Sequence, residues 1–156
     1  MKLSEGVEWS LHCMCVLAVL PERTALPGGR LAEMHGVPVA YLQKHLQSLS
    51  RAGVLESARG KGGGYRLARS PSAITLWDVV SAVEGAQPAF RCTEIRRKGT
   101  LGNLPAREFR FACTVTRVMH EAEAAWRAEL ESRTLADLVG QIPPAYAAMV
   151  SDVTSG

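Results

Sequence analysis

The hydrophobic and polar positions of residues 7–20, VEWSLHCMCVLAVL, follow the period of an amphipathic α-helix. Its apolar stripe consists of Val7, Leu11, Met14 and Ala18. A second stripe along the edge carries a carboxylate, an imidazole and a thiol, from Glu8, His12 and Cys15. Such groups are costly to bury without a partner, so this edge is a candidate ligand surface. A solvated Glu, a hydrogen-bonded His and a small buried Cys would give the same pattern.

Residues 37–53 also show a helical period, with a clear division between an apolar and a polar face. Pro38 suits the first turn of this helix and Gly53 suits its end. The apolar face consists of Val39, Leu42, Leu46 and Leu49. The polar face consists of Tyr41, Lys44, Gln47 and Arg51. A shorter helix is expected just before it, at residues 30–36, closed by Gly36.

Two short strands are expected next, in residues 54–60 and 65–69, with GKGGG as the tip of a hairpin between them. Three helices followed by such a hairpin is the order of a winged helix-turn-helix, in which the third helix enters the DNA major groove. Tyr41, Lys44 and Gln47 can then reach base edges or phosphates. Further phosphate contacts are expected from Arg51, Arg59, Lys61 and Arg66. A solvated helix beside a surface hairpin is the alternative, whereas GKGGG lacks the spacing of a nucleotide-binding loop.

The second half of the chain contains a capped helix, a long loop and a long helix. Thr75 and Asp78 form a capping box for a helix that ends at Gly85. Residues 86–111 have no sustained period, which predicts a loop, and residues 114–132 predict a long helix. One side of that helix is an apolar stripe of Val115, Val118, Met119, Ala122, Trp126 and Leu130. A three-helix winged domain cannot cover this stripe, so a second copy of the chain is expected to cover it.

The predicted fold is mostly α with a small β-wing, a winged helix-turn-helix domain plus a long dimerisation helix, assembled as a homodimer. The expected parts are a DNA-binding domain at residues 1–85, a loop at 86–113, the dimerisation helix with a short terminal helix at 114–140, and a flexible tail at 141–156. The expected partner is a double-stranded DNA operator, without a membrane or a small-molecule substrate.

Composition narrows the function further. The chain has 156 residues, 47% hydrophobic content, four cysteines and a formal net charge of +3. We expect a cytoplasmic protein, because residues 11–20 are too short to span a membrane and acidic residues precede them where an export signal needs positive charge. In a reducing compartment four cysteines favour metal, cluster or redox chemistry over a disulfide framework. No nucleophile has a base and an orienting acid in a recognisable arrangement, so an enzyme is not expected.

Three segments together resemble the Rrf-two family of bacterial winged-helix regulators. They are MKLSEGVEWSLHCMCVLAVL, VAYLQKHLQSLSRAGVLESARGKGGGYRLAR and ITLWDVVSAVEG, and the resemblance extends to about Val139. It implies a homodimeric DNA-binding regulator with an iron-sulfur cluster held by the loop at 86–113. The usual family loop has three cysteines close together, whereas this loop keeps only Cys92 and Cys113, and Phe109 stands where some relatives have another cysteine.

Two thiolates cannot complete the four protein ligands of a cluster. The GVEW and LHC segments and the loop start FRCTEIR resemble a redox regulator of the family that binds a 2Fe-2S cluster through two Cys, one Glu and one His. The matching positions here are Glu8, His12, Cys92 and Cys113. Trp9 lies between two of these ligands in sequence and is a hypothetical redox relay, with a packing role as the alternative. We assign no role to His35, His45 or His120.

Several alternatives remain open from the sequence. Cys15 shares the stripe of Glu8 and His12 and could replace one of them, and Cys13 is a weaker candidate on another face. Zinc binds the same residue types. A metal-free regulator could switch through a disulfide between Cys92 and Cys113. A third possibility is an iron-sulfur or docking module that does not bind DNA, against which the basic wing argues.

Overall fold

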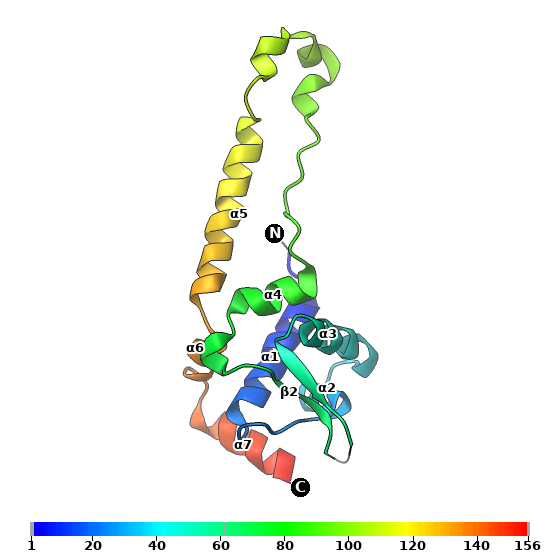
Figure 1. Cartoon of the computed structure of the whole chain (residues 1–156), viewed down its shortest axis with the longest axis vertical. Helices are drawn as coiled ribbons and strands as arrows, with labels where there is room; N and C mark the ends of the chain where they lie inside the picture. The colour runs from blue at the N-terminus through cyan, green and yellow to red at the C-terminus, as the bar shows by residue number, and fades with distance from the viewer. Residues whose placement is uncertain (1, 61, 156) are drawn as a thin grey trace. The chain divides into compact units, whose positions relative to one another are not determined.

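The structure is a computed structural model that describes residues 2–60 and 62–155 (Figure 1). Its contacts divide the chain into two units. One unit is formed by residues 2–86 together with 130–156, and the other by residues 87–129. The DNA-binding elements predicted from the sequence lie in the first unit, which we call the winged unit. The long loop and the long helix lie in the second, which we call the loop unit. No helix in the described part of the chain is long and apolar enough to cross a membrane.

The winged unit begins with three helices and a hairpin, in the predicted order. The helices are α1 (Glu5–Val19), α2 (Gly28–His35) and α3 (Val39–Arg51). Strand β1 (Leu55–Ala58) pairs antiparallel with β2 (Gly64–Leu67), and Leu55 lies opposite Leu67. A 3₁₀ turn η1 (Pro71–Ala73) and helix α4 (Leu76–Glu84) follow. The predicted mostly helical fold with a two-stranded wing is confirmed.

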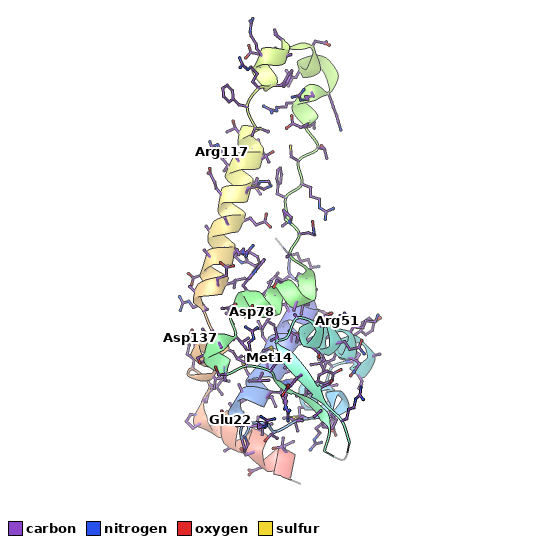
Figure 2. The ribbon with its side chains drawn as sticks, viewed as in Figure 1. Met14, Glu22, Arg51, Asp78, Arg117 and Asp137 are labelled. Carbon is purple, nitrogen blue, oxygen red and sulfur yellow. The ribbon has the colours of Figure 1, made fainter. Side chains whose placement is uncertain are left out.

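The core of this unit surrounds α1, which packs against α3, α4 and α6 (Leu135–Val139). Met14, labelled in Figure 2, is fully buried. The other fully buried large side chains come from every neighbouring element, and they are Leu31, Leu42, Leu46, Leu49, Leu55, Ile74, Val79 and Leu135. Three of the four residues predicted for the apolar face of α3 are therefore in the core. The fourth, Val39, was predicted wrongly: it is 52% exposed, because it lies in the first turn, beyond the packed part of the helix.

The predicted helix ends are present. Gly36 ends α2 in a left-handed conformation with a φ of 63°, and its N–H bonds to the carbonyls of Ala32 and Glu33. Thr75 and Asp78 form the predicted capping box of α4, in which each side chain accepts a hydrogen bond from the other residue's backbone N–H. These ends depend on local chemistry only, which is why the sequence predicts them well.

The wing is attached to the segment that precedes α2. Leu26 and Tyr65 exchange two backbone hydrogen bonds, of 3.0 and 2.8 Å. Gly64 has a φ of 147°, and a Cβ at this position would collide with the backbone of Leu26 and Pro27. Glycine therefore allows β2 to approach this segment closely enough for the two bonds to form.

The end of the chain differs from the flexible tail expected at residues 141–156. Residues Pro144–Ser155 form a helix, α7, which packs against α1. Val150 is 4% exposed and Tyr146 is partly buried against the core. Arg30 of α2 donates a hydrogen bond of 2.7 Å to the carbonyl of Val153. The apolar residues of this segment therefore complete the core, and the two prolines lie at the start of the helix, where they are tolerated.

The loop unit consists of three 3₁₀ turns and most of one long helix. The turns are η2 (Ile95–Arg97), η3 (Gly99–Asn103) and η4 (Ala106–Phe109), and the helix is α5 (Thr114–Ser132). The long helix has the predicted bounds. None of residues 87–129 is buried in this unit. On α5 the predicted apolar stripe is open to solvent, and Val115, Val118 and Met119 are each more than 40% exposed.

Candidate functional site

The polar face of α3 is exposed as predicted for a recognition helix. Tyr41, Lys44, Gln47 and Arg51 are all exposed. The Lys44 ammonium lies 5.4 Å from the centre of the Tyr41 ring. Arg51, seen at the end of α3 in Figure 2, donates a hydrogen bond of 3.0 Å to Ser48. Two cations, an amide and a phenol are thus presented to solvent from one helix face, a set that can contact both phosphates and base edges.

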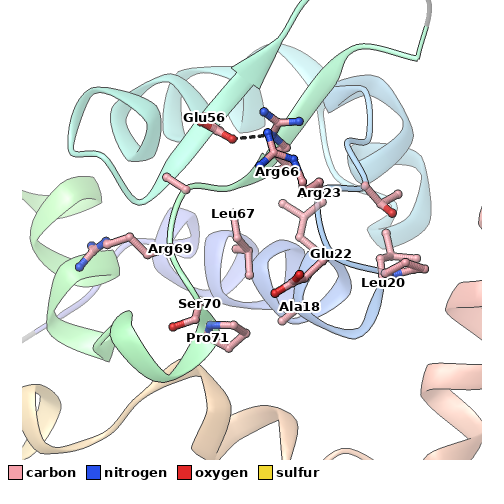
Figure 3. A pocket seen from close by; sticks show the side chains of 14 residues that line it. Ala18, Leu20, Glu22, Arg23, Glu56, Arg66, Leu67, Arg69, Ser70 and Pro71 are labelled. Carbon is pink, nitrogen blue, oxygen red and sulfur yellow. Dashed lines mark hydrogen bonds and ion pairs between the residues drawn. The ribbon is translucent and has the colours of Figure 1, made fainter.

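The basic residues predicted for the wing differ in their availability. Arg59 is exposed at the end of the first strand. Lys61 lies outside the described residues. Arg66 is partly buried at the base of the wing, and its Nε donates to Glu56 Oε1 at 2.5 Å. Figure 3 shows this pair at the edge of a hollow lined also by Arg23, with Leu67 near its centre. Arg59 is therefore more available than Arg66 to a phosphate.

A hydrogen bond links the recognition helix to the wing. Gln43 Nε2 donates to the hydroxyl of Tyr65 at 2.7 Å, and Tyr65 itself is buried. The Gln43 side chain also lies against Gly28 at the start of α2. A Cβ at Gly28 would come within 2.6 Å of Gln43 Oε1. α2, α3 and β2 therefore meet at Gln43. This contact fixes the recognition helix against the wing.

Glu8 and His12 lie one turn apart on the exposed edge of α1. Both line two adjoining surface hollows, one of which also contains Trp9, His35 and Val37. Trp9 is half-buried, and its ring meets that of His45 edge-on at 6.3 Å. The carboxylate and the imidazole of the predicted ligand set are thus accessible from one side of the helix, and the partly buried Trp9 lines the same hollow and packs against the core.

His35 is a neighbour of this edge that the sequence did not reveal. Its ring centre lies 5.8 Å from that of His12, and its buried Nε2 has no hydrogen-bond partner among the described residues. Burial lowers the pKa of His35, and the nearby His12 lowers it further. His35, to which the sequence analysis assigns no role, therefore lies beside a candidate ligand. His35 is the last residue of a different helix, so no spacing along the chain could indicate this contact.

The two other cysteines of α1 are buried. Cys13 is 0% exposed and Cys15 is 7% exposed, and both belong to the hydrophobic core. Burial raises the pKa of Cys13 to about 12 and also raises that of Cys15. Both thiols are close enough to Tyr146 of α7 for their charge to raise its pKa, after the larger effect of burial. A thiol in this environment is a poor ligand and a poor nucleophile, because only the thiolate binds and reacts well.

Cys92 and Cys113 are the accessible thiols of the loop unit. Cys92 is exposed, and its Sγ accepts a hydrogen bond of 3.3 Å from the Glu94 N–H. Cys113 is half-buried directly before α5. Hydrogen bonds from the backbone N–H groups of Thr116 and Val115, together with the charge of Arg96, lower the pKa of Cys113. The first turn of a helix favours a thiolate in this way.

The four predicted ligands thus form two pairs, with Glu8 and His12 in the winged unit and Cys92 and Cys113 in the loop unit. Within residues 2–60 and 62–155, no three His, Cys, Asp or Glu side chains are grouped closely enough to hold a metal ion. The donor set itself suits iron in a 2Fe-2S cluster, which accepts imidazole in place of thiolate. All four side chains are at least partly accessible to solvent.

Comparison with known proteins agrees with this architecture. Residues 3–141 match the Rrf2 family, described as iron-dependent transcriptional regulators, which is the family that the sequence motifs resemble. The chain belongs to the Rrf2 family. The match includes the winged helix-turn-helix, the cysteine loop and α5, and it ends just before α7.

Solved structures of Rrf2-type regulators share the fold. IscR of T. potens is 25% identical, with a TM-score of 0.66 over 95% of this chain and 96% of that protein. CymR, the global cysteine regulator of B. subtilis, is 24% identical, with a TM-score of 0.65 over 92% of this chain and 99% of that protein. This Rrf2 protein is therefore a transcription regulator with a DNA-binding winged helix, and not an enzyme.

Proposed function

We propose that this Rrf2 protein is a cytoplasmic, homodimeric regulator whose operator binding depends on the redox state of a 2Fe-2S cluster. Glu8, His12, Cys92 and Cys113 are the proposed ligands. The observation that carries this assignment is the contrast in burial: these four side chains are accessible, whereas Cys13 and Cys15 are buried in the core. The GVEW, LHC and FRCTEIR segments resemble those of the redox regulator RsrR, and this resemblance implies the same ligand set.

Each residue has a distinct part in this proposal. The lowered pKa of Cys113 keeps its thiolate available for iron, and the Glu94 N–H donates a hydrogen bond to Cys92 Sγ that helps to orient it. Glu8 and His12 add a carboxylate and an imidazole, which donate less electron density than thiolates and so raise the reduction potential. When bound, the cluster supplies one-electron redox chemistry. Trp9, whose ring meets that of His45 edge-on, is the proposed relay from this edge to the DNA-binding elements.

The first test is anaerobic purification followed by an absorption spectrum and iron and sulfide counts. Cys92→Ser and Cys113→Ser should each abolish the visible absorption of the cluster. With a single thiolate, the site has too few soft sulfur ligands to hold an iron-sulfur cluster. Cys15→Ala is the matched control, since it removes a thiol from the core and should keep the spectrum. A native spectrum in either loop variant, or its loss in Cys15→Ala, would overturn the ligand assignment. A colourless protein that contains zinc would identify a zinc site instead.

DNA binding is proposed to use the exposed face of α3 and the wing. If a dimer neutralises about six phosphates, the slope of log affinity against log salt should be near −5. Lys44→Ala should reduce the slope by about one to two units, because each protomer loses one cation, and Gln47→Ala should relax the preference at particular base pairs. Arg117→Ala on α5 is the control, because its partner is Glu121, and it should change neither property. An unchanged slope in Lys44→Ala would remove α3 from the interface.

A metal-free thiol switch is the second candidate. It is favoured by the fact that the two accessible thiols lie in the same unit and that Cys113 has a lowered pKa. A disulfide between Cys92 and Cys113 would then change operator affinity without any colour. An anaerobic, colourless preparation that loses or gains DNA affinity on oxidation, with no such change in Cys92→Ser, would support it. Unchanged redox-dependent affinity in Trp9→Ala would remove Trp9 from the relay in either case.

A further inference from the structure

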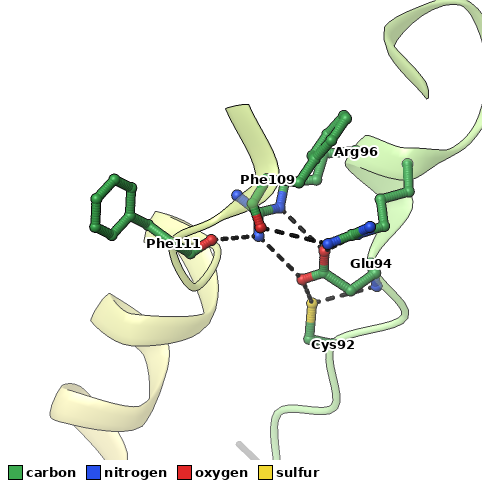
Figure 4. A network of polar contacts seen from close by, with 6 residues as sticks. Cys92, Glu94, Arg96, Phe109 and Phe111 are labelled. Carbon is green, nitrogen blue, oxygen red and sulfur yellow. Dashed lines mark hydrogen bonds and ion pairs between the residues drawn. The ribbon is translucent and has the colours of Figure 1, made fainter. Parts of the chain in front are cut away.

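A network of polar contacts connects the segment after Cys92 with the segment before Cys113 (Figure 4). Its centre is the carboxylate of Glu94. Arg96 binds that carboxylate through both Nε, at 3.1 Å to Oε2, and Nη2, at 3.5 Å to Oε1. Arg97 Nε adds a third contact at 3.4 Å to Oε2.

The same two arginines reach the other side of the loop. Arg96 Nη2 donates to the carbonyl of Phe111 at 2.7 Å, and Arg97 Nη2 donates to the carbonyl of Phe109 at 3.3 Å. Both guanidinium groups also face the Phe109 ring, at 5.8 Å for Arg96 and 5.0 Å for Arg97. Phe109 and Phe111 lie four and two residues before Cys113, so these contacts close the loop near both cysteines.

On the side of Cys92 the network touches the thiol itself. Glu94 has a left-handed backbone, with a φ of 50° and a ψ of 45°, which is uncommon for a residue other than glycine. This conformation directs its N–H toward Cys92 Sγ, at 3.3 Å. The Cys92 thiol in turn donates to Glu94 Oε1 at 3.6 Å. The carboxylate of Glu94 is therefore held between the thiol and the two arginines.

We propose that Glu94 and Arg96, assisted by Arg97, form a clasp that positions Cys92 and Cys113 as one two-thiol site. Residues 93–112 join the two cysteines along the chain and have no buried side chain. Closing such a loop costs conformational entropy. Because the clasp already holds the loop closed, ligand binding does not have to supply that free energy. A second contact supports the base of the loop, where Glu123 of α5 accepts a hydrogen bond of 2.7 Å from the Ala89 N–H.

The clasp explains why a loop with widely spaced cysteines can act as a ligand pair. An isolated surface ion pair contributes little, but here one guanidinium binds a carboxylate with two nitrogens and a carbonyl as well. The identity of the bound metal group rests on the proposed function. The pairing of the Cys92 and Cys113 thiols by the clasp does not. Glu94 and Arg96 are positioning residues, since neither is proposed to touch the metal group.

The test compares Glu94→Gln, Arg96→Ala and the double variant with Arg107→Ala in the full-length chain. Arg107 forms an exposed ion pair with Glu108 in the same loop, so its removal is a matched control. The metal-free protein is titrated with Cd²⁺ under anaerobic conditions, and the thiolate-to-cadmium absorption is recorded. We expect the Cd²⁺ dissociation constant to rise at least tenfold in Arg96→Ala and to a similar extent in the double variant, because the two residues act as a unit. Arg96→Lys should recover only part of the affinity, because lysine cannot bind two acceptors in a fork.

Cluster-loaded protein gives an independent readout. Loss of the clasp should shift the visible spectrum and the midpoint potential, because hydrogen bonds to the ligating sulfur change. Equal Cd²⁺ affinity in Arg96→Ala and Arg107→Ala, with an unchanged potential, would overturn the clasp. A parent protein that never holds a cluster, but whose Cd²⁺ affinity still falls in Arg96→Ala, would overturn the proposed cofactor and leave the clasp supported. Circular dichroism of each variant should match the parent, because no side chain of the loop unit is part of the buried core.

Discussion

The two units of this Rrf2 protein are stabilised by different means. Every buried hydrophobic side chain among the described residues lies in the winged unit, whereas residues 87–129 contain none. The loop unit instead has ion pairs, including the exposed pair of Arg117 with Glu121 and the partly buried pair of Arg96 with Glu94. Such pairs contribute little on their own. The winged unit therefore has the core of an independent domain, whereas the apolar stripe of the loop unit is exposed and is proposed to be covered by a second copy of the chain.

The largest effect is expected from a charge placed in the core of the winged unit. Val150 of α7 is 4% exposed, whereas its neighbour Met149 is 67% exposed. Val150→Asp should lower the free energy of unfolding by about 3 kcal/mol, because a carboxylate would be buried without a partner. Met149→Asp should change it by less than about 0.5 kcal/mol. Denaturant unfolding of both variants makes the comparison. Equal stabilities would show that α7 is not part of the core.

A smaller effect is expected from the same kind of substitution in the loop unit. Ala122 lies within the apolar stripe of α5, and Ala124 lies on the opposite side of the helix; both are exposed. If a second copy covers the stripe, Ala122→Glu should raise the dimer dissociation constant by about 100-fold, or about 2.7 kcal/mol. Ala124→Glu should leave it unchanged. Sedimentation of the two variants at several concentrations gives the result. If both variants stayed dimeric, the stripe could not be the interface.

The winged unit was largely predictable because its signals are local or periodic. The spacing of Leu42, Leu46 and Leu49 predicts the buried face of α3, and the capping box at Thr75 predicts the start of α4. The exception is α7, whose two prolines and Ser/Thr/Gly-containing end favour a flexible tail over a helix. Its helix is stabilised by contacts with α1 and α2, which are distant in sequence. Tertiary packing of this kind cannot be read from a short window.

The candidate site was predictable only in part, for a similar reason. Glu8 and His12 share a helix face, so their spacing indicates a common surface, and the structure leaves both exposed. The burial of Cys15 could not be predicted from its stripe, because α7 contributes to covering it. The contact of His35 with His12 joins two helices, and the clasp at Glu94 joins two ends of a loop without periodicity. Side chains that meet across the fold give no pattern along the chain.

The smallest predicted effect is on the melting temperature, and it distinguishes two carboxylates, Asp137 in the winged unit and Glu94 in the loop unit. In the winged unit, Asp137 accepts hydrogen bonds from the backbone N–H of Thr134, at 2.7 Å, and from its hydroxyl, at 2.8 Å, and these lower its pKa. Because the folded-state pKa is lowered, its stabilisation is complete above the unfolded-state value of about 3.9 and is lost as pH falls through the folded-state pKa. Asp137→Asn should therefore melt at a lower temperature than the parent at pH 7, and the difference should shrink below about pH 4.

Glu94 also has a lowered pKa, through its hydrogen bond with Arg96, but it lies in the unit without buried side chains. Glu94→Gln should therefore leave the main calorimetric transition unchanged at every pH, because that transition reports the core of the winged unit. Calorimetry from pH 3 to 7 makes this comparison. A lower melting temperature in Asp137→Asn, with no change in Glu94→Gln, would show that the main transition reports the winged unit alone. A Glu94→Gln variant that lowered the melting temperature as much as Asp137→Asn would mean that the loop unit and the core unfold together, so the clasp would contribute to the stability of the whole chain.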